Sequence, residues 1–561
     1  MKTFINPYKF GICLVCTVFL LNACTKNFGE INTDPNLVTQ PDVKYLFTYT
    51  ADRLPPSTTE WIWESLEQLM RYTQQVSASP YELSGSVNTR YRAYYADILP
   101  NLIEIRHQID LKEDKERYQK MGAVTYILGV YYGIRVTDVN GSIPYSEAML
   151  ARYEGKFDPV FDPQQALFTR WLDELDNAIQ ALADANLPDQ ESYGDADIYY
   201  QSDWTKWIKL ANTLKFRIAA RLENQDREAT RRIFQEVMQD ATGPIDGNDA
   251  QLQYLNPTQA FLGADVDYRS RRYANRQMVR FMKKSADPRI RIYFDQNDLT
   301  GSFRDTLAKY NVQLPAFIDP NDPLVMYQGG PADWTTDQSV TQWMSNAFQV
   351  SQYSRYFLIS PVNRLFLSPK LNGATGNALH VLVSYAETCF YIAEFIQKGY
   401  GAGIDTKGSL SDWYNKGIAS SIVTMNEVAR EAGSSLGFTG DGTAEIQAYQ
   451  QHPEVVLGGG NDLERIYIQA YLSFFRLPNE AYVLCRRTGY PRTGSTYYPM
   501  EPFNEPIPRR FGISDPGEVN RANWEQAYQE QDFTLRAVDA QTLSQERVWY
   551  DKNAPAFGGG D

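Results

Sequence analysis

Hydrophobic side chains recur along most of the chain at the three- and four-residue spacing of an amphipathic helix. From Trp204 onward, positions 208, 211, 214 and 218 are apolar, and the same spacing recurs within 121–131 and 379–393. Further helices are expected over about 42–54, 58–77, 89–110, 163–184, 227–240, 272–284, 409–431, 462–475 and 478–488. Successive helices of this length predict an all-α fold of antiparallel helix pairs, stacked as in tetratricopeptide-type solenoids.

Residues 245–377 depart from this pattern. Asn-Pro, Asp-Pro and Gly-Gly-Pro sequences recur there, and one clear helix, over about 272–284, interrupts them. The segment is nevertheless rich in Tyr and Trp, and aromatic side chains in turn-rich sequence are harder to bury than those on periodic helices. We therefore expect a long irregular insertion in the helical scaffold that forms the ligand-binding face.

The N-terminus has the features of a signal peptide. Lys2 and Lys9 precede an apolar run that is shorter than the roughly 20 residues needed to span a bilayer. The run ends in Leu-Asn-Ala-Cys24, which resembles the lipobox of bacterial lipoproteins, in which the cysteine is acylated. We expect residues 1–23 to be removed, Cys24 to carry lipid, 24–40 to form a polar tether and 41–561 to form a single domain.

The composition narrows the possible functions. The chain has 561 residues, of which 43% are hydrophobic, so a large core is available and wholesale disorder is excluded. Its formal charge of −14 argues against nucleic-acid binding, which depends on a basic surface. Three widely spaced histidines argue against a histidine-rich metal site. Aromatic residues reach 13%, more than a core needs, and this surplus points to a binding surface.

Several segments, taken in order, resemble motifs of the SusD/RagB family of nutrient-binding outer-membrane lipoproteins. The sequence Pro-Tyr-Ser-Glu-Ala ends one of them at residue 148, and Arg-Arg-Thr-Gly-Tyr-Pro ends another at residue 491. The matching segments are 28–36, 132–148, 194–195, 204–222, 477–491, 507–511 and 548–551. The chain departs from the family where no acidic run follows Cys24 and where its long loops align with no motif.

The resemblance implies a fold, a role and a partner. The fold would be all-α, with tetratricopeptide-like helix pairs and long irregular loops. The lipoprotein would cap a SusC-like, TonB-dependent β-barrel transporter as a hinged lid, facing the cell exterior, and would pass captured oligosaccharide into the barrel without catalysing a reaction. Some members of the family take peptide, and that alternative stays open here.

Exposed aromatic residues are the predicted ligand contacts. A flat ring covers the apolar face of a sugar, and neighbouring Asp, Asn or Arg groups hydrogen-bond its hydroxyl rim. A turn that exposes an indole beside a carboxylate is the strongest instance, and a loop between two helices supplies a second platform. The candidate contacts are Trp334, Asp333, Trp343, Asn346, Tyr327 and Tyr81.

Two enzymatic interpretations compete with binding. Glu387 and Glu394 lie on one face of a helix and would suit a glycosidase, but buried carboxylates more commonly pair with arginines such as Arg217 and Arg221. Ser435 stands in a Gly-x-Ser-x-Gly sequence, yet a helix precedes it where a nucleophile elbow needs a strand. We expect a structural ion-pair network at the first site and a helix end at the second.

Metal binding is the last alternative. Oxygen-rich loops around residues 295–298 and 319–322 offer ligands for a structural Ca²⁺. Neither has the spacing of an EF-hand, and such clusters commonly form turns alone. We therefore expect no metal site and no cofactor.

Overall fold

The computed structural model describes residues 41–78, 88–256, 272–348, 358–363, 376–434, 437–438 and 440–557. The predicted signal peptide, the tether with Cys24, Tyr81 and Ser435 lie outside these residues.

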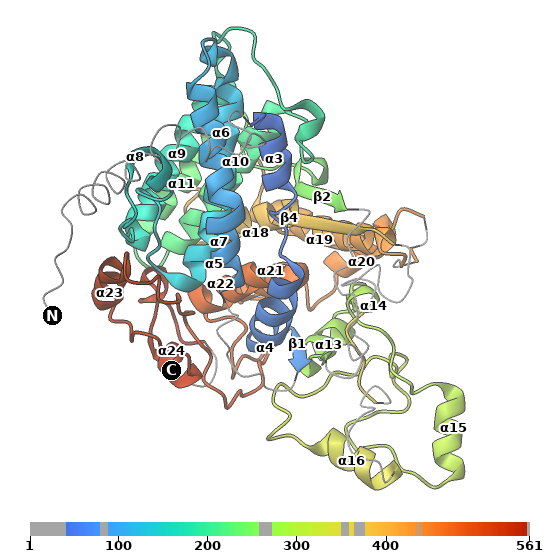
Figure 1. Ribbon diagram of the computed structural model, residues 1–561. Coiled ribbons are helices and arrows are strands. Elements are labelled where there is room, and N and C mark those ends of the chain that lie inside the picture. Colours follow the sequence, from blue (N-terminus) through green and yellow to red (C-terminus); the bar gives the residue numbers. More distant parts are fainter. Residues whose placement is uncertain are drawn as a thin grey trace, which may run out of the picture.

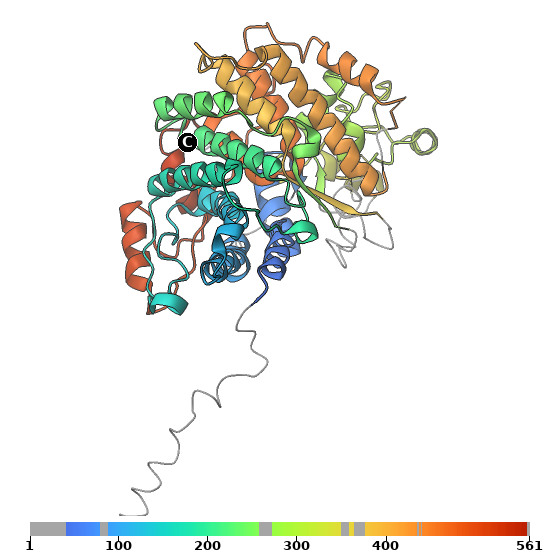
Figure 2. The same ribbon diagram turned by 90° about the horizontal axis from the view of Figure 1, so that it is seen from above.

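Stacked helices make up the first half of the molecule (Figures 1 and 2). Helix α6 packs on α7, α7 on α9, α9 on α10, and α10 on α11. The helices are α3 (Val43–Ala51), α4 (Met70–Tyr72), α5 (Thr89–Ala93), α6 (Leu99–Asp110), α7 (Gln119–Asn140), α8 (Ala151–Glu154), α9 (Gln164–Ala183), α10 (Trp204–Leu222) and α11 (Arg227–Gln239). Two stretches of π-helix, Glu60–Leu69 and Tyr94–Ile98, lead into α4 and α6.

A second set of helices completes the body. Helix α18 packs on α19, α21 and α10, and so joins the two halves. This set comprises α18 (Tyr385–Gln397), α19 (Leu410–Glu431), α20 (Thr443–Gln450), α21 (Asp462–Ser473), α22 (Pro478–Thr488), α23 (Arg521–Glu530) and α24 (Ala540–Gln545). Short 3-10 turns lie at Lys115–Tyr118, Gly194–Ala196, Asn248–Ala250, Phe474–Arg476 and Trp549–Asp551.

The sequence pattern explains these helices. On α10, Ile208, Leu214 and Ile218 are buried as their spacing predicts, and the Asp203 side chain caps the helix by accepting from the backbone N–H groups of residues 205 and 206. Helix α19 begins with a reciprocal capping box and ends at Glu431, before Gly433 takes a left-handed φ of 90°. The predicted all-α fold of stacked, tetratricopeptide-like helix pairs is confirmed.

Short strands correct one predicted helix. Residues 379–382, expected on a helical face, belong to β4 (Ala378–Val383), which pairs antiparallel with β2 (Leu252–Asn256). This segment is only six residues long and ends in β-branched Val383, so pairing with a distant strand prevails over its helical spacing. A second antiparallel pair joins β1 (Val76–Ala78) to β3 (Arg272–Ala274).

The loop-rich insertion holds more helix than expected. It contains α13 (Arg276–Lys284), α14 (Ile290–Tyr293), α15 (Gly301–Lys309) and α16 (Ser339–Phe348). Residues 295–348, called the lobe below, project from the helical body and carry α15 and α16 (Figure 1). The lobe has a small hydrophobic core of its own, which includes Leu299, Leu307, Trp334, Val340 and Met344.

Candidate functional site

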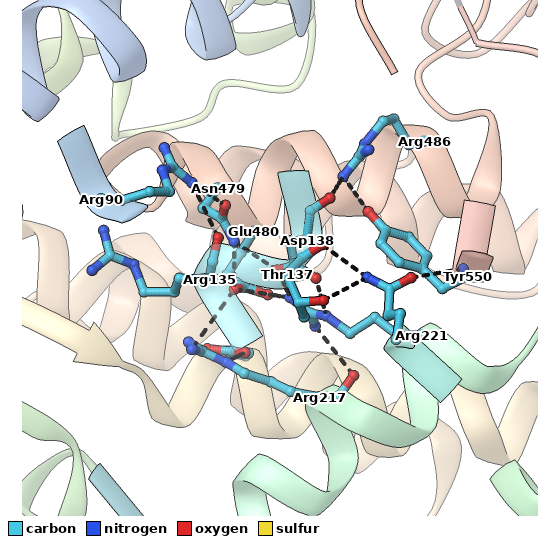
Figure 3. A network of polar contacts seen from close by, with 12 residues as sticks. Arg90, Arg135, Thr137, Asp138, Arg217, Arg221, Asn479, Glu480, Arg486 and Tyr550 are labelled. Atoms are coloured by element: carbon cyan, nitrogen blue, oxygen red, sulfur yellow. Dashed lines mark hydrogen bonds and ion pairs between the residues drawn. The ribbon is translucent and has the colours of Figure 1, made fainter. Parts of the chain in front are cut away.

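A group of buried charged side chains in the helical body forms a connected network (Figure 3). At its centre, Arg221 Nη2 lies 2.8 Å from Asp138 Oδ2 and 3.0 Å from Glu480 Oε2. Arg217 Nε donates to Glu387 Oε1 at 2.6 Å, and its Nη1 lies 3.7 Å from Glu480 Oε1. Each of these side chains is at most 3% exposed, so every charge depends on its partners rather than on water.

The network continues toward the N-terminal helices. Arg90 Nε donates to Glu64 Oε2 at 2.9 Å, and Arg135 Nη2 to Glu60 Oε1 at 2.5 Å. Asn479 links the two ends, since its Oδ1 accepts from Arg90 at 2.6 Å. Its Nδ2 in turn donates to Asp138 Oδ2 at 2.9 Å.

Four of the segments that carry the family resemblance, 132–148, 204–222, 477–491 and 548–551, meet here. Asp138 comes from α7, Arg217 and Arg221 from α10, and Glu480 from α22. Arg486 of α22 donates to the backbone oxygen of Asp138 at 2.6 Å and to the Tyr550 hydroxyl near the C-terminus. These motifs therefore hold the fold together and do not line an open ligand site.

The carboxylates considered for acid-base catalysis are buried and paired. Burial raises the pKa of Glu387 above its ordinary value, and Arg217 offsets this only in part. Burial would raise the pKa of Glu394 as well, but Arg487 and Lys398 outweigh it and lower the pKa to about 2. Both Glu394 oxygens accept from Arg487 at 2.6 Å, so Glu394 belongs to a neighbouring cluster rather than to the network of Arg217 and Arg221.

A small cavity of about 40 Å³ lies beside the network. Its lining includes Glu60, Arg90, Arg135 and Glu480, whose charges already have protein partners. A space of this size holds water molecules and no sugar ring. The cavity is therefore too small to hold a sugar substrate.

The aromatic turn predicted to be exposed is instead packed inward. Trp334 is 6% exposed and Tyr327 is 7% exposed, and Trp334 contacts the ring of Tyr273. The expectation that this turn exposes its indole is wrong because the two preceding glycines let it pack closely. A Cβ on Gly330 would lie 2.5 Å from Trp334, and one on Gly329 would lie 2.3 Å from the backbone of Arg276.

Asp333 is also buried, and its Oδ1 accepts from the backbone N–H and the hydroxyl of Thr335 at 2.8 and 2.6 Å. These bonds lower its pKa although burial opposes them. The carboxylate therefore shapes a local turn in this conformation.

Two of the candidate contacts are accessible at the outer end of the lobe. Asn346 is exposed on α16, and Trp343 on the same helix is half-buried. The indole N–H of Trp343 donates to the backbone oxygen of Gln313 at 2.7 Å, which fixes the ring against the segment after α15.

The oxygen-rich loops form turns. Asp319 accepts from the backbone N–H of Asn321 at 2.8 Å, and Asp322 accepts from that of Leu324 at 2.8 Å and from Lys283 at 2.6 Å. Within the described ranges, no group of three or more His, Cys, Asp or Glu side chains is arranged to hold a metal ion.

Sequence reasoning missed Asp138 and Glu480 at the centre of the network, although both lie in segments with a family motif. It also missed Glu60, Glu64 and Arg90, which are buried in two segments without a motif. The sequence does contain a signal for the two glutamates. Glu60 and Glu64 are four residues apart in a run that also contains Trp61 and Leu66, so two acids lie on an otherwise apolar helix. Their arginine partners could not be identified from spacing.

None of the helices in the described part of the chain is long and apolar enough to cross a membrane.

Comparison with known proteins identifies the fold family. A family model of SusD-like proteins, described as "Starch-binding associating with outer membrane", matches residues 35–513. No curated protein matches the sequence.

Solved structures share the fold. A chitin-binding protein has a TM-score of 0.67 at 21% identity, over 91% of this chain and 100% of its own. The chitin-binding SusD homologue of Flavobacterium johnsoniae has a TM-score of 0.62 at 19% identity, over 91% and 99%. A SusD homologue of Bacteroides fragilis has a TM-score of 0.63 at 21% identity, over 91% and 100%.

The structural likeness alone establishes a common architecture, and the family model spans most of the chain. The resemblance drawn from the ordered motifs is thereby confirmed, and the protein belongs to the SusD-like family.

Proposed function

We propose that this protein is a lipid-anchored outer-membrane lipoprotein that binds oligosaccharide nutrients and delivers them to a SusC-like, TonB-dependent transporter. The match of the starch-binding family model to residues 35–513 is the observation that carries this proposal. The titles of two solved structures with the same fold name chitin as the ligand of those proteins, which supports a glycan as the ligand class.

Binding without catalysis agrees with the state of the acidic side chains. A glycosidase needs carboxyl groups that face each other across an open cleft. Glu387 and Glu394, the pair singled out by the sequence, are instead buried against arginines. Their role is to stabilise helix packing.

The membrane association proposed here rests on Cys24. A lipid on this residue would hold the described domain through a tether of residues 24–40, and the chain would be anchored to the outer membrane without spanning it. Replacement of Cys24 by Ser should release the protein from the membrane fraction, while the wild type stays in it.

The ligand face assigned here is the lobe with its adjacent loops. In the described conformation Trp343 and Asn346 are accessible to a sugar, with Tyr81 as a further candidate. Trp334, Tyr327 and Asp333 would contact ligand only after the turn that contains them moves away from α13.

A glycan array tests the ligand class. The soluble chain lacking residues 1–24 is expected to retain one class of oligosaccharide and to release no shorter product on prolonged incubation. Released sugar fragments would support a hydrolase, and retention of peptides in place of glycans would support peptide uptake. Copurification of a β-barrel with the wild-type lipoprotein tests the transporter partnership separately.

A further inference from the structure

The helical body carries an open groove far from the lobe. It lies between α6, the start of α7 and the end of α9, where α7 packs on both of the other helices, and its volume is about 680 Å³. Small side chains form part of its lining, namely Gly122, Ala123, Ala178 and Ala181. These side chains are too short to fill the space between the helices.

An aromatic ring and a cation form one wall. Tyr126 is half-buried, and the guanidinium of Arg106 lies 4.2 Å from the centre of its ring. Arg106 Nη1 donates to Thr125 Oγ1 at 3.2 Å, and no carboxylate of the described residues lies within ion-pair distance of it. The remaining N–H groups of Arg106 are therefore available to a ligand.

Further polar groups line the opposite side of the groove. Arg170 Nε donates to Glu174 Oε1 at 3.0 Å, and Glu174 also accepts from the Tyr145 hydroxyl at 2.5 Å. Asn177 lies one turn further along α9 and is exposed. These side chains offer hydrogen-bond donors and acceptors above the apolar floor that the small lining residues form.

Tyr118 extends the groove. Its ring lines the groove and also a second hollow of about 400 Å³, to which Leu111 and Lys112 contribute. Lys112 Nζ lies 4.7 Å from the ring centre. A single half-buried tyrosine therefore separates two adjoining spaces, so a linear ligand that occupied both would cross its ring.

The charges of the groove favour a neutral ligand. The basic and acidic residues of its lining are equal in number, namely Arg106, Lys115 and Arg170 against Asp110, Glu116 and Glu174. The volume is within the range typical of small-molecule sites, about 300–1,000 Å³. Aromatic rings, small apolar floor residues and paired donors and acceptors match a sugar, which has an apolar face and a rim of hydroxyls.

We propose that this groove is a second carbohydrate-binding site, which holds a neutral oligosaccharide that extends across Tyr118. The inference rests on the proposed glycan-binding function and adds a site on the helical scaffold, apart from the lobe. A ligand held at both places would be retained longer than by either alone.

Hydroxyl-radical footprinting tests the site directly. The probes are maltoheptaose and chitohexaose, added at saturation to the soluble chain lacking residues 1–24, with calorimetry to establish that they bind. The proposal expects oxidation of Tyr118 and Tyr126 to fall by about three- to tenfold, as a ring-stacking contact would produce. Phe157, which is 66% exposed and lies neither on the lobe nor in the lining of the groove, is the internal control and should keep its reactivity.

Matched variants separate stacking from folding. Tyr118→Ala should abolish the protection of Tyr126, whereas Tyr118→Phe, which keeps the ring face, should preserve it. Circular dichroism checks that both variants are folded.

The outcomes separate this site from the general function. If a probe binds by calorimetry while Tyr118 and Tyr126 stay fully reactive, the groove proposal is wrong and glycan binding stands. If no member of a glycan panel binds the wild type, the proposed function fails and the groove fails with it. If Tyr118 and Tyr126 are protected by a copurified transporter and not by the sugar, the groove is a protein contact. That result would also overturn the proposal.

Discussion

The buried network and the lobe use charged side chains in opposite ways. In the network, Arg221 bonds Glu480, which is 259 residues away along the chain, and Arg217 bonds Glu387, which is 170 residues away. In the lobe, Asp333 and Asp337 bond Thr335 and Ser339, each two residues ahead. The network therefore joins distant helices, whereas the lobe mostly stabilises its own turns.

This difference indicates where the chain tolerates change. Removal of one partner from a buried pair leaves an uncompensated charge, so the network restricts several helices together. A local turn requires only its own few residues, so neighbouring surface positions are free to differ. Four of the family motifs contribute to the network and none of the motifs lies in the lobe, as this reasoning expects.

Arg221→Ala should have the largest effect. Arg221 is fully buried between Asp138 and Glu480, and its loss leaves both carboxylates without their shared partner. We expect a loss of about 3–5 kcal/mol in the free energy of unfolding. Urea denaturation measures this, and Arg231→Ala, on the exposed face of α11, is the matched control that should change stability little. Equal urea-denaturation midpoints for Arg221→Ala and Arg231→Ala would contradict the structural role of the network.

Glu394→Gln should destabilise the protein in a pH-dependent way. The folded-state pKa of Glu394 is about 2, below its ordinary value of 4.5. The charge therefore contributes about 3 kcal/mol above pH 4.5, and this contribution is lost as the pH falls toward 2. Stability curves of the wild type and the variant should converge between pH 4.5 and 2. A difference that stays constant across this interval would refute the ion-pair assignment.

Glu387→Gln should have a smaller effect on stability. Burial raises the pKa of Glu387, so its charge is less favoured than that of Glu394. We expect a loss of about 1.5–3 kcal/mol, the range for hydrogen bonds to charged groups, and unchanged affinity for glycan. Thermal unfolding and glycan retention are measured on the same sample. Lost binding by a fully folded variant would instead assign Glu387 to the ligand site.

A substitution at the accessible end of the lobe should show the reverse pattern, with weaker ligand binding and little change in stability. Trp343→Ala removes a half-buried ring at the outer end of the lobe and should weaken glycan affinity by about three- to tenfold. Trp334→Ala, by contrast, empties a position in the core of the lobe and should lower its stability. Affinity calorimetry and thermal unfolding of both variants separate the roles. Equal affinity of Trp343→Ala and the wild type would remove Trp343 from the ligand face.

Helical segments were the part most predictable from sequence. The hydrophobic spacing around Ile208 and Leu214 is a local pattern, and a helix N-cap such as Asp203 is recognised from the three residues that follow it. The conformation of the lobe was harder to predict from sequence. Gly329 and Gly330 suggested an exposed turn, but because glycine has no side chain they allow the turn to pack closely. The local spacing of residues 379–382 predicts a helix, because the strand that pairs with them is distant in sequence.

The sequence by itself determined the helical scaffold and the presence of buried acids and arginines, because both depend on spacing within a few turns, and its ordered motifs indicated the family. Only the tertiary structure decided which arginine meets which acid, that Trp334 points inward, and that Tyr118 and Tyr126 border an open groove. These features arise where segments remote along the chain come into contact. Coulomb attraction, packing and the space left between helices act across distance in space and not along the sequence.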